Sequence, residues 1–309
     1  MRVLVTGGTG YLGSTIVRAL AARGHHPVVF SRHASTAGLP GVPIDGDIRD
    51  LTALRGATAG ADAIIHSAAL VSVWREHAIE FREVNVGGLH NVIEAARTLG
   101  IPRLVYTSSF LALPPFGASE PLDANDYQRT KREARDVALA AAARGSPIVT
   151  LYPGVVYGPG KRTEGNLVGR LLHDHLAGRL PGIIGGDRQW SFAYVEDVAA
   201  AHVTAVESLE ASGEYSLGGE NATPMRVFEI TRRLTGVKLP RRIPVWIAYA
   251  AGGVEEVLAR VTRTPPLLTR GAVEIFRHDW RMDSARSVSE LSYRIRPLEE
   301  GIRAMLEAH

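Results

Sequence analysis

The sequence predicts an α/β fold: a doubly wound parallel sheet with a smaller, mostly helical C-terminal lobe. Five or six short apolar segments alternate with helical segments over the first half of the 309 residues, an order typical of a parallel sheet covered by helices. A glycine-rich run joins the first strand to the first helix. The alternation weakens from about residue 160. We therefore assign residues 1–158 and 187–212 to the sheet domain, and residues 159–186 and 213–309 to the lobe.

Composition favours a globular protein without nucleic-acid or membrane partners. Apolar residues make up 45% of the chain, which is enough for a large core. The net charge is only +3 and no long run of Lys or Arg concentrates it, so we expect no nucleic-acid binding. The chain has no cysteine, which excludes disulfides and thiolate metal sites, and we expect no metal. No apolar stretch is long enough to span a membrane, and we expect a cytoplasmic protein.

The first strand, residues 2–6, leads directly into glycines at positions 7, 8, 10 and 13, and residues 14–20 then read as a helix. Glycines let the backbone turn tightly and approach a phosphate closely, while the helix start offers unpaired N–H groups and a positive dipole end. This arrangement predicts a site for the pyrophosphate of a dinucleotide. The alternative is a tight strand–helix connection without a ligand.

The remaining elements follow in order along the chain. Further strands are expected at residues 27–30, 42–44, 61–66, 103–107 and 147–151. Long helices are expected at residues 76–99 and 127–144, with a turn-rich exit at 152–160. In the second half, residues 214–217 read as a strand, and helices are expected at 167–177, 195–209, 224–234, 245–260 and 297–308. We expect the lobe to cover the open edge of the sheet.

Ser31 and Arg32 end the second strand, about twenty residues after the glycines, where a dinucleotide fold meets the adenosine ribose. An acidic residue there favours NAD by holding the 2′-hydroxyl. A guanidinium and a hydroxyl instead suit a 2′-phosphate. We therefore predict NADP(H) as the cofactor, with NAD(H) as the less favoured alternative. In the competing interpretation Arg32 only stacks on adenine or faces solvent.

Two further segments are expected to border the dinucleotide. Asp47 and Ile48 are placed to bracket the adenine, although a helix cap by Asp50 explains part of this run equally well. The small residues Ser67, Ala68 and Ala69 follow the fourth strand and leave room at its carboxyl end. His66, just before them, is expected to be packed or hydrogen-bonded rather than a ligand.

Ser109, Tyr127 and Lys131 are the predicted catalytic residues. Tyr127 and Lys131 are four apart on one helix and share a face, and Ser109 follows the fifth strand. A free tyrosine has a pKa near 10, and a neighbouring ammonium together with a cationic nicotinamide favours the tyrosinate and brings this pKa towards the working pH. We expect Tyr127 to donate a proton, Lys131 to lower its pKa and hold the nicotinamide ribose, and Ser109 to orient the substrate oxygen.

Motifs at residues 6–13, 47–48, 66–69, 84–88, 106–109, 127–131, 153–159 and 195–199 together resemble the extended branch of the short-chain dehydrogenase/reductase family. The Pro-Gly-Val-Val-Tyr-Gly-Pro run at 153–159 is most similar to dihydroflavonol-reductase-like members. The resemblance implies a Rossmann sheet, hydride chemistry, a serine–tyrosine–lysine site, reduction of a ketone or aldehyde, and homodimers formed through the helices at 76–99 and 127–144. The residues expected at the cofactor are Gly7, Thr9, Gly10, Tyr11, Leu12, Gly13, Ser31, Arg32, Asp47, Ile48, Ser67, Ala68, Ala69, Thr107, Tyr127, Lys131, Tyr152, Pro153 and Val155.

The expected substrate wall is apolar or aromatic, which suits a small-molecule carbonyl compound. Its candidates are Trp74, Leu111, Leu113, Phe116, Tyr157, Asn166, Trp190 and Phe192. Trp190 and Phe192 alternatively pack the junction between the two lobes. Two features make a nucleotide sugar a less expected substrate. The stretch after Ser109 is apolar, and Tyr152 stands where sugar-nucleotide members often have arginine. A sugar epimerase or dehydratase and a non-catalytic dinucleotide sensor are the competing functions.

Overall fold

The computed structural model describes residues 1–72 and 74–308 and has a parallel seven-stranded sheet at its centre. The spatial order is β10-β6-β5-β4-β1-β2-β3, and every pair in it is parallel. Its strands are β1 (Arg2–Thr6), β2 (His26–Ser31), β3 (Val42–Asp45), β4 (Ala63–His66), β5 (Leu104–Thr107), β6 (Ile148–Pro153) and β10 (Gly213–Leu217). The predicted fold class is therefore confirmed.

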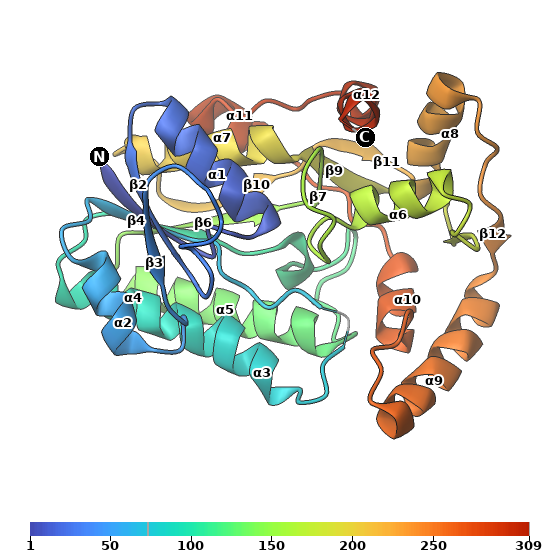
Figure 1. Ribbon diagram of the computed structural model, residues 1–309, viewed down its shortest axis with the longest axis horizontal. Helices are drawn as coiled ribbons and strands as arrows, with labels where there is room; N and C mark the ends of the chain where they lie inside the picture. Colours follow the sequence, from blue (N-terminus) through green and yellow to red (C-terminus); the bar gives the residue numbers. More distant parts are fainter. Residues whose placement is uncertain (73, 309) are drawn as a thin grey trace.

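Helices cover both faces of this sheet (Figure 1). On one face lie α1 (Tyr11–Ala22), α7 (Val195–Glu207) and α11 (Ala285–Leu291), and on the other α2 (Leu51–Thr58), α4 (Gly88–Thr98) and α5 (Asp126–Ala143). The buried strands are rich in Val, Ile and Leu because both of their faces meet helices. The chain runs outward from β1 to β3 and then returns to β4, so a ligand crevice is expected between the carboxyl ends of β1 and β4.

The long helix expected at residues 76–99 is three consecutive pieces. It starts as α3 (Ile79–Arg82), widens into the π-helical turn η1 (Glu83–Gly87) and continues as α4. The Asn85 side chain within η1 accepts a hydrogen bond from Leu70 N at 2.7 Å and donates to Thr130 Oγ1 at 3.0 Å. π-Helical turns of this kind recur at functional sites.

The C-terminal lobe contains short strands as well as helices. The helices are α6 (Leu167–Leu176), α8 (Pro224–Thr235), α9 (Val245–Thr262), α10 (Arg270–Phe276) and α12 (Leu298–Glu307). The strands are β7 (Val155–Tyr157), β9 (Trp190–Tyr194) and β11 (Glu220–Ala222) in one small sheet, and β8 (Ile183–Ile184) and β12 (Arg242–Ile243) in another. The prediction of a turn-rich exit at 152–160 is wrong in part, because that segment includes the end of β6 and all of β7.

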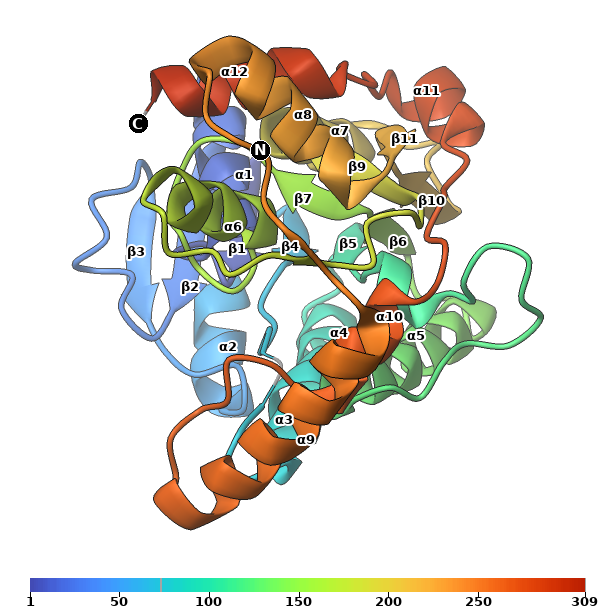
Figure 2. The same ribbon diagram turned by 90° about the vertical axis from the view of Figure 1, so that its right-hand side faces the viewer.

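Strand membership differs from the predicted division in two places. β10 belongs to the large sheet, although residues 213–217 are assigned above to the lobe. β9 belongs to the small sheet, although residues 190–194 are assigned above to the sheet domain. Figure 2 shows the lobe helices on the side of the molecule that faces the carboxyl ends of the strands. Within the described residues, no helix has the length and apolar character needed to cross a bilayer.

Candidate active site

The glycine loop leaves room for an anion at the start of α1. Gly7 has φ +70°, a left-handed conformation that favours glycine, and a Cβ on it would lie 2.6 Å from the backbone of Ala68. A Cβ on Gly13 would lie 2.2 Å from the Gly7 carbonyl oxygen, so both positions require glycine. α1 begins after Gly10 without a side-chain cap or an acidic residue in its first turn. Its unpaired N–H groups and positive dipole end therefore fit the pyrophosphate of a dinucleotide.

Segment 158–161 packs over this loop. The Tyr11 hydroxyl donates to the Gly158 carbonyl at 3.0 Å, and Leu12 packs against the sheet core. The Lys161 ammonium lies 3.5 Å from the Thr9 carbonyl oxygen, which brings a cation to the edge of the cradle. Lys161 is a residue that sequence reasoning missed, because only tertiary folding brings it beside the glycines.

The end of β2 presents a buried hydroxyl and an exposed guanidinium, and the charge of that guanidinium also acts on the Asp47 carboxylate. Ser31 Oγ is buried and has no hydrogen-bond partner among the described residues. Arg32 is exposed, and in the described part of the chain its guanidinium makes no hydrogen bond. A buried, unpaired hydroxyl beside an exposed guanidinium fits a ribose or phosphate oxygen.

The predicted adenine residues have contacts of their own. Hydrogen bonds from the Arg49 side chain, chiefly, lower the pKa of Asp47 to about 2, and the two groups are 2.7 Å apart at their nearest oxygen and nitrogen. Ile48 is buried and meets α4 at Gly88, while Asp50 caps α2 as the alternative interpretation expects. Adenine contact by Asp47 and Ile48 stays a prediction.

The opposite wall of the crevice is built by the segment after β4. Ser67 Oγ donates to the Thr6 carbonyl at 2.8 Å, which fixes Ser67 and Ala68 across from the glycine loop. His66 is fully buried, with Nδ1 2.7 Å from Thr6 Oγ1, and its ring stacks on Tyr106. Burial lowers the pKa of His66 to about 3, so the ring is neutral and packed.

Ser109 and Tyr127 are brought together at the junction of the sheet and the lobe. Ser109 follows β5 and starts the short helix η2 (Phe110–Ala112), and Tyr127 lies in the first turn of α5. The Ser109 side chain is close enough to Tyr127 to favour its ionised form, and Ser109 Oγ accepts a hydrogen bond from Leu111 N at 3.2 Å. Tyr127 packs against the apolar core of the lobe, whereas Ala134, further along α5, belongs to the core of the sheet. The tyrosine thus lies where the two cores meet.

Lys131 is buried one helical turn further along α5. Its ammonium donates to the Thr107 carbonyl at 3.2 Å, and burial lowers the pKa of Lys131 to about 8. The Thr107 hydroxyl is 2.9 Å from His202 Nε2. His202 Nδ1 lies 2.8 Å from the Val198 carbonyl oxygen and donates to it, so Nε2 accepts from the threonine. Thr107 therefore connects α5 on one face of the sheet to α7 on the other.

The pKa of Tyr127 lies above that of a free tyrosine. In the protein alone, burial raises the pKa of Tyr127 to about 12, and the neighbouring Ser109 offsets this rise only in part. Desolvation of the phenolate is the main cause of the shift. The lowering of this pKa by Lys131 together with a cationic nicotinamide stays a prediction. At neutral pH the Tyr127 hydroxyl holds its proton.

Two amides position these groups, and sequence reasoning gave neither a role. The fully buried Gln128 donates to the Leu111 carbonyl at 3.2 Å and accepts from Ala124 N at 3.0 Å, which ties the 110–124 loop to α5. Asn85 fixes Thr130 and the Leu70 backbone, as described above. The sequence shows that Gln128 directly follows Tyr127, and that Asn85 is a polar residue within an apolar helix. The partners of both amides, however, are set by tertiary contacts.

The predicted cofactor residues around the end of β6 have different environments. The Tyr152 hydroxyl donates to the Glu214 carboxylate and accepts from Arg135 Nε at 3.0 Å. These contacts occupy its hydroxyl, and its backbone pairs with Ser216 of β10 in the large sheet. Pro153 is the last residue of β6, and Val155, the first of β7, is buried in the lobe core. Their contact with a cofactor stays a prediction.

The candidate substrate residues occupy different environments. Leu111 is buried near Ser109, and Trp74 and Leu113 are partly buried. Phe116 is 57% exposed, with the Arg281 guanidinium 3.7 Å from its ring centroid. Fully packed in the lobe core are Tyr157, Trp190 and Phe192. Trp190 and Phe192 therefore pack inside the lobe, and their packing at the junction between the two lobes stays a prediction.

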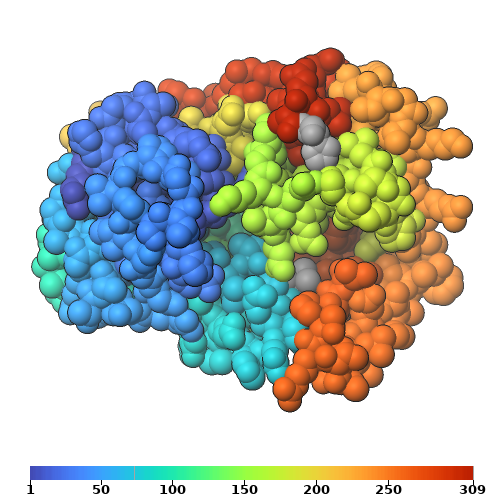
Figure 3. Space-filling view, viewed as in Figure 1, coloured from blue at the N-terminus to red at the C-terminus, as the bar shows by residue number. Residues whose placement is uncertain are grey.

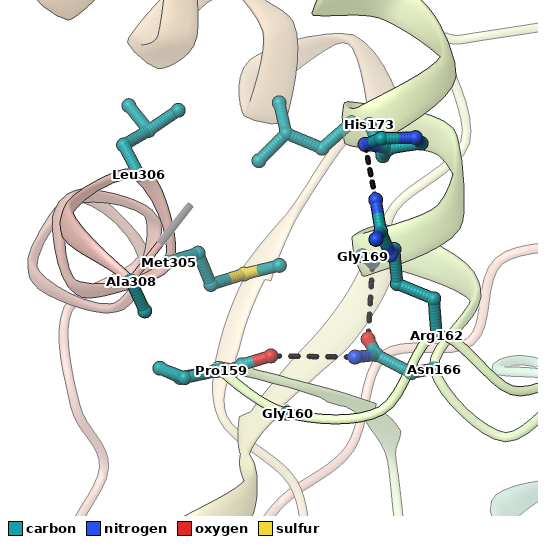
Figure 4. Close-up of a pocket in the computed structure, with 11 residues that line it drawn as sticks. Pro159, Gly160, Arg162, Asn166, Gly169, His173, Met305, Leu306 and Ala308 are labelled. Carbon is teal, nitrogen blue, oxygen red and sulfur yellow. Dashed lines mark hydrogen bonds between the residues drawn. The ribbon is translucent and has the colours of Figure 1, made fainter.

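A hollow away from the catalytic residues lies between segment 158–169, α6 and α12 (Figure 4). Asn166, named above as a candidate for the substrate wall, caps α6 there, because its Oδ1 accepts from Gly169 N at 3.0 Å. Its amide also donates to the Gly158 carbonyl at 3.3 Å. The side chain therefore has a local structural role.

Comparison with known proteins agrees with this geometry. The model of a family described as the NAD dependent epimerase/dehydratase family matches residues 3–218. A sterol demethylase protein B from Methylococcus capsulatus is 32% identical over 94% of this chain and 93% of its own length. A 2-alkyl-3-oxoalkanoate reductase from Stenotrophomonas maltophilia is 34% identical, with 99% of this chain and 98% of the relative covered.

A solved structure has the same fold and holds a nicotinamide dinucleotide. The UDP-glucose 4-epimerase of Thermus thermophilus in complex with NAD superposes with a TM-score of 0.76 at 25% identity. The match covers 100% of this chain and 98% of that structure. The expectation of a Rossmann fold is thereby confirmed.

Proposed function

Because the chain belongs to the NAD dependent epimerase/dehydratase family and is an NAD(P)-dependent oxidoreductase of the extended short-chain branch, we propose that it is a carbonyl reductase. Its substrate is a ketone or aldehyde, and its reductant is NADPH. The observation that carries the proposal is the proximity of Ser109 to Tyr127, with the buried Lys131 one helical turn further along α5.

The bound nicotinamide supplies the hydride, and the protein supplies the proton and the orientation. Tyr127 holds its proton at neutral pH, which is the form that a carbonyl oxygen needs as it gains negative charge. Ser109 hydrogen-bonds the same oxygen and fixes its position. Lys131, held at the Thr107 carbonyl, provides a positive charge next to the phenol when the tyrosine becomes deprotonated.

The preference for NADPH is supported by the end of β2. Arg32 is exposed, and Ser31 Oγ is buried without a partner in the described residues. The nearest carboxylate along β3, Asp45, is engaged by Ser35, whose backbone N donates to it at 2.9 Å. A 2′-phosphate therefore meets donors at this position, and NAD lacks the phosphate that would use them.

The substrate class is supported by the apolar surroundings of Ser109 and by a relative. Leu111 and Leu113 follow the serine, and Tyr127 packs against the apolar lobe core. The reductase from Stenotrophomonas maltophilia, by its name, acts on a 2-alkyl-3-oxoalkanoate, a ketone that carries alkyl chains and a carboxylate. We infer that this chain reduces a carbonyl compound with similar alkyl chains.

Cofactor stoichiometry tests the proposal. Purified protein is mixed with NADPH and a panel of ketones, aldehydes and sugar nucleotides, and absorbance of the reduced nicotinamide is followed. A reductase consumes one NADPH for each alcohol formed. Conversion of a sugar nucleotide without net loss of NADPH, with NAD retained by the protein, would instead identify an epimerase or dehydratase.

A further inference from the structure

Helix α9 exposes its large apolar side chains and buries its small ones. Trp246 is 74% exposed and Val261 is 79% exposed, whereas Ala248, Gly252 and Ala259 are buried. A helix on the surface of a water-soluble domain normally has the reverse pattern, with its large apolar residues towards the core. Figures 1 and 2 place α9 at the outer edge of the molecule, with α10 beside it.

The exposed residues form one continuous stripe along the helix. Trp246, Ala250, Val254, Val257 and Val261 follow each other at steps of three or four residues, so they share a face. In the space-filling view α9 forms the projecting corner of the lobe (Figure 3). A contiguous exposed apolar stripe that runs along a whole helix is typical of an interaction surface.

The carboxylates of α9 are turned away from the stripe and are already partnered. Glu256 forms an ion pair with Arg270 at 2.8 Å, and Glu255 accepts from Leu267 N at 2.7 Å. A Cβ on Gly252 would lie 3.0 Å from the Arg270 backbone nitrogen, so the helix packs closely on this segment. These contacts fix the rotation of α9 and leave its outward face without negative charge.

Basic residues lie before and after α9 in the sequence, and one lies in its last turn. Residues 238–270 contain six basic and two acidic side chains, a net charge of +4, whereas the whole chain has +3. Lys238 and Arg241 lie before the helix and Arg260 lies in its last turn. Among the described residues, these three have no ion pair or hydrogen bond to their side chains. The segment therefore carries more than the entire excess of positive charge in the protein.

This distribution of charge disfavours a second copy of the chain as the partner. Pairing two α9 helices, parallel or antiparallel, brings a cationic end of one against a cationic end of the other. Like charges placed opposite each other in an interface oppose association. An anionic surface with an apolar interior complements both the stripe and its ends.

We propose that α9 docks on the surface of a lipid bilayer that contains anionic headgroups. Trp246, Val257 and Val261 enter the boundary between headgroups and acyl chains, and Lys238, Arg241 and Arg260 contact the headgroup phosphates. The proposal is independent of the reaction assigned to Tyr127. It departs from the expectation that no membrane is involved, because the sequence does not show which face of α9 is exposed.

Vesicle flotation of the full-length protein tests the docking. We expect binding to vesicles of phosphatidylcholine with phosphatidylglycerol and little binding to phosphatidylcholine alone. The double variant Val257→Ser/Val261→Ser should bind about tenfold more weakly. Lys238→Gln/Arg241→Gln should bind about thirtyfold more weakly at low salt. Leu209→Ser is the matched control, since this leucine is 90% exposed elsewhere and its loss should change nothing.

Any of three outcomes would overturn the proposal: failure of the wild-type protein to float with anionic vesicles, equal binding to neutral vesicles, or wild-type binding by the valine variants. A light-scattering mass that falls from dimer to monomer in the valine variants, without vesicle binding, would assign the stripe to a second copy. Unchanged circular dichroism and melting of each variant show that the comparison is between folded proteins.

Discussion

Tyr127 combines a partly buried ring, a neighbouring serine and a lysine one helical turn away. The four-residue spacing of Tyr127 and Lys131 predicted that they share a helix face. Because Ser109 follows a predicted strand, it was expected at the carboxyl edge of the sheet. Sequence reasoning could not predict the pKa of Tyr127, because desolvation depends on the lobe residues that pack around the ring. Nor could it find His202, which meets Thr107 from the opposite face of the sheet.

Arg32 is the residue on which the cofactor preference depends. The Arg32→Gln variant should lose about tenfold to a hundredfold in kcat/KM for NADPH, since a charge-assisted hydrogen bond contributes about 1.5–3 kcal/mol. Its kcat/KM for NADH should change little. The measurement is steady-state kinetics with both cofactors, with the exposed Arg97→Gln as control. An equal loss with both cofactors would contradict the role of Arg32.

His202 makes the protein less stable in acid. Burial lowers the pKa of His202 to about 4, below the value of about 6.5 in an unfolded chain. Since the unfolded state binds the proton first, stability is lost as pH falls below about 6.5, by about 1.4 kcal/mol per pH unit, down to about 4. Urea unfolding at pH 7, 6 and 5 measures this slope. In His202→Gln the slope should be smaller by that amount, and an unchanged slope would contradict the neutral, buried imidazole.

At the scale of elements, the strand–glycine–helix unit was predictable and the π-helical turn was not. β1 has the bounds that its apolar run predicts, and Gly24 lies just after α1 with φ +78°, as expected of a helix end. The helix is interrupted at η1, where the Asn85 side chain bonds to Leu70 and Thr130. Such contacts do not alter the helical period, so a sequence pattern does not reveal them.

The glycine loop makes a prediction at this scale. Gly13→Ala places a Cβ against the Gly7 carbonyl oxygen, so the loop must shift where it is expected to hold the pyrophosphate. Affinity for NADPH should fall about tenfold or more, as measured by calorimetric titration. Gly56→Ala in α2 is the control, because nothing lies within 4 Å of its added Cβ. That control should keep its affinity and gain up to about 1 kcal/mol of stability. Equal affinities in all three proteins would contradict the placement of the cofactor.

At the scale of the whole molecule, the alternation of strands and helices predicted the doubly wound sheet. In the small sheets of the lobe, the strands β7, β8, β11 and β12 escaped prediction because two or three residues leave too short a pattern, and the five-residue β9 was not recognised as a strand either. The strand β10 was seen, but its place beside β6 depends on tertiary pairing. The homodimer through the helices at 76–99 and 127–144 stays a prediction. The site itself lies between the core of the sheet and the core of the lobe.

The central claim is that Tyr127, at this junction, gives the proton to the carbonyl oxygen. The most direct measurement compares single-turnover reduction by Tyr127→Phe and by the wild type, together with the Kd for NADPH. Loss of a general acid predicts a rate about 10²–10⁴-fold lower. The Kd for NADPH should stay unchanged, and the exposed Tyr249→Phe serves as control. Reduction at the wild-type rate by Tyr127→Phe, with NADPH bound normally, would contradict the account.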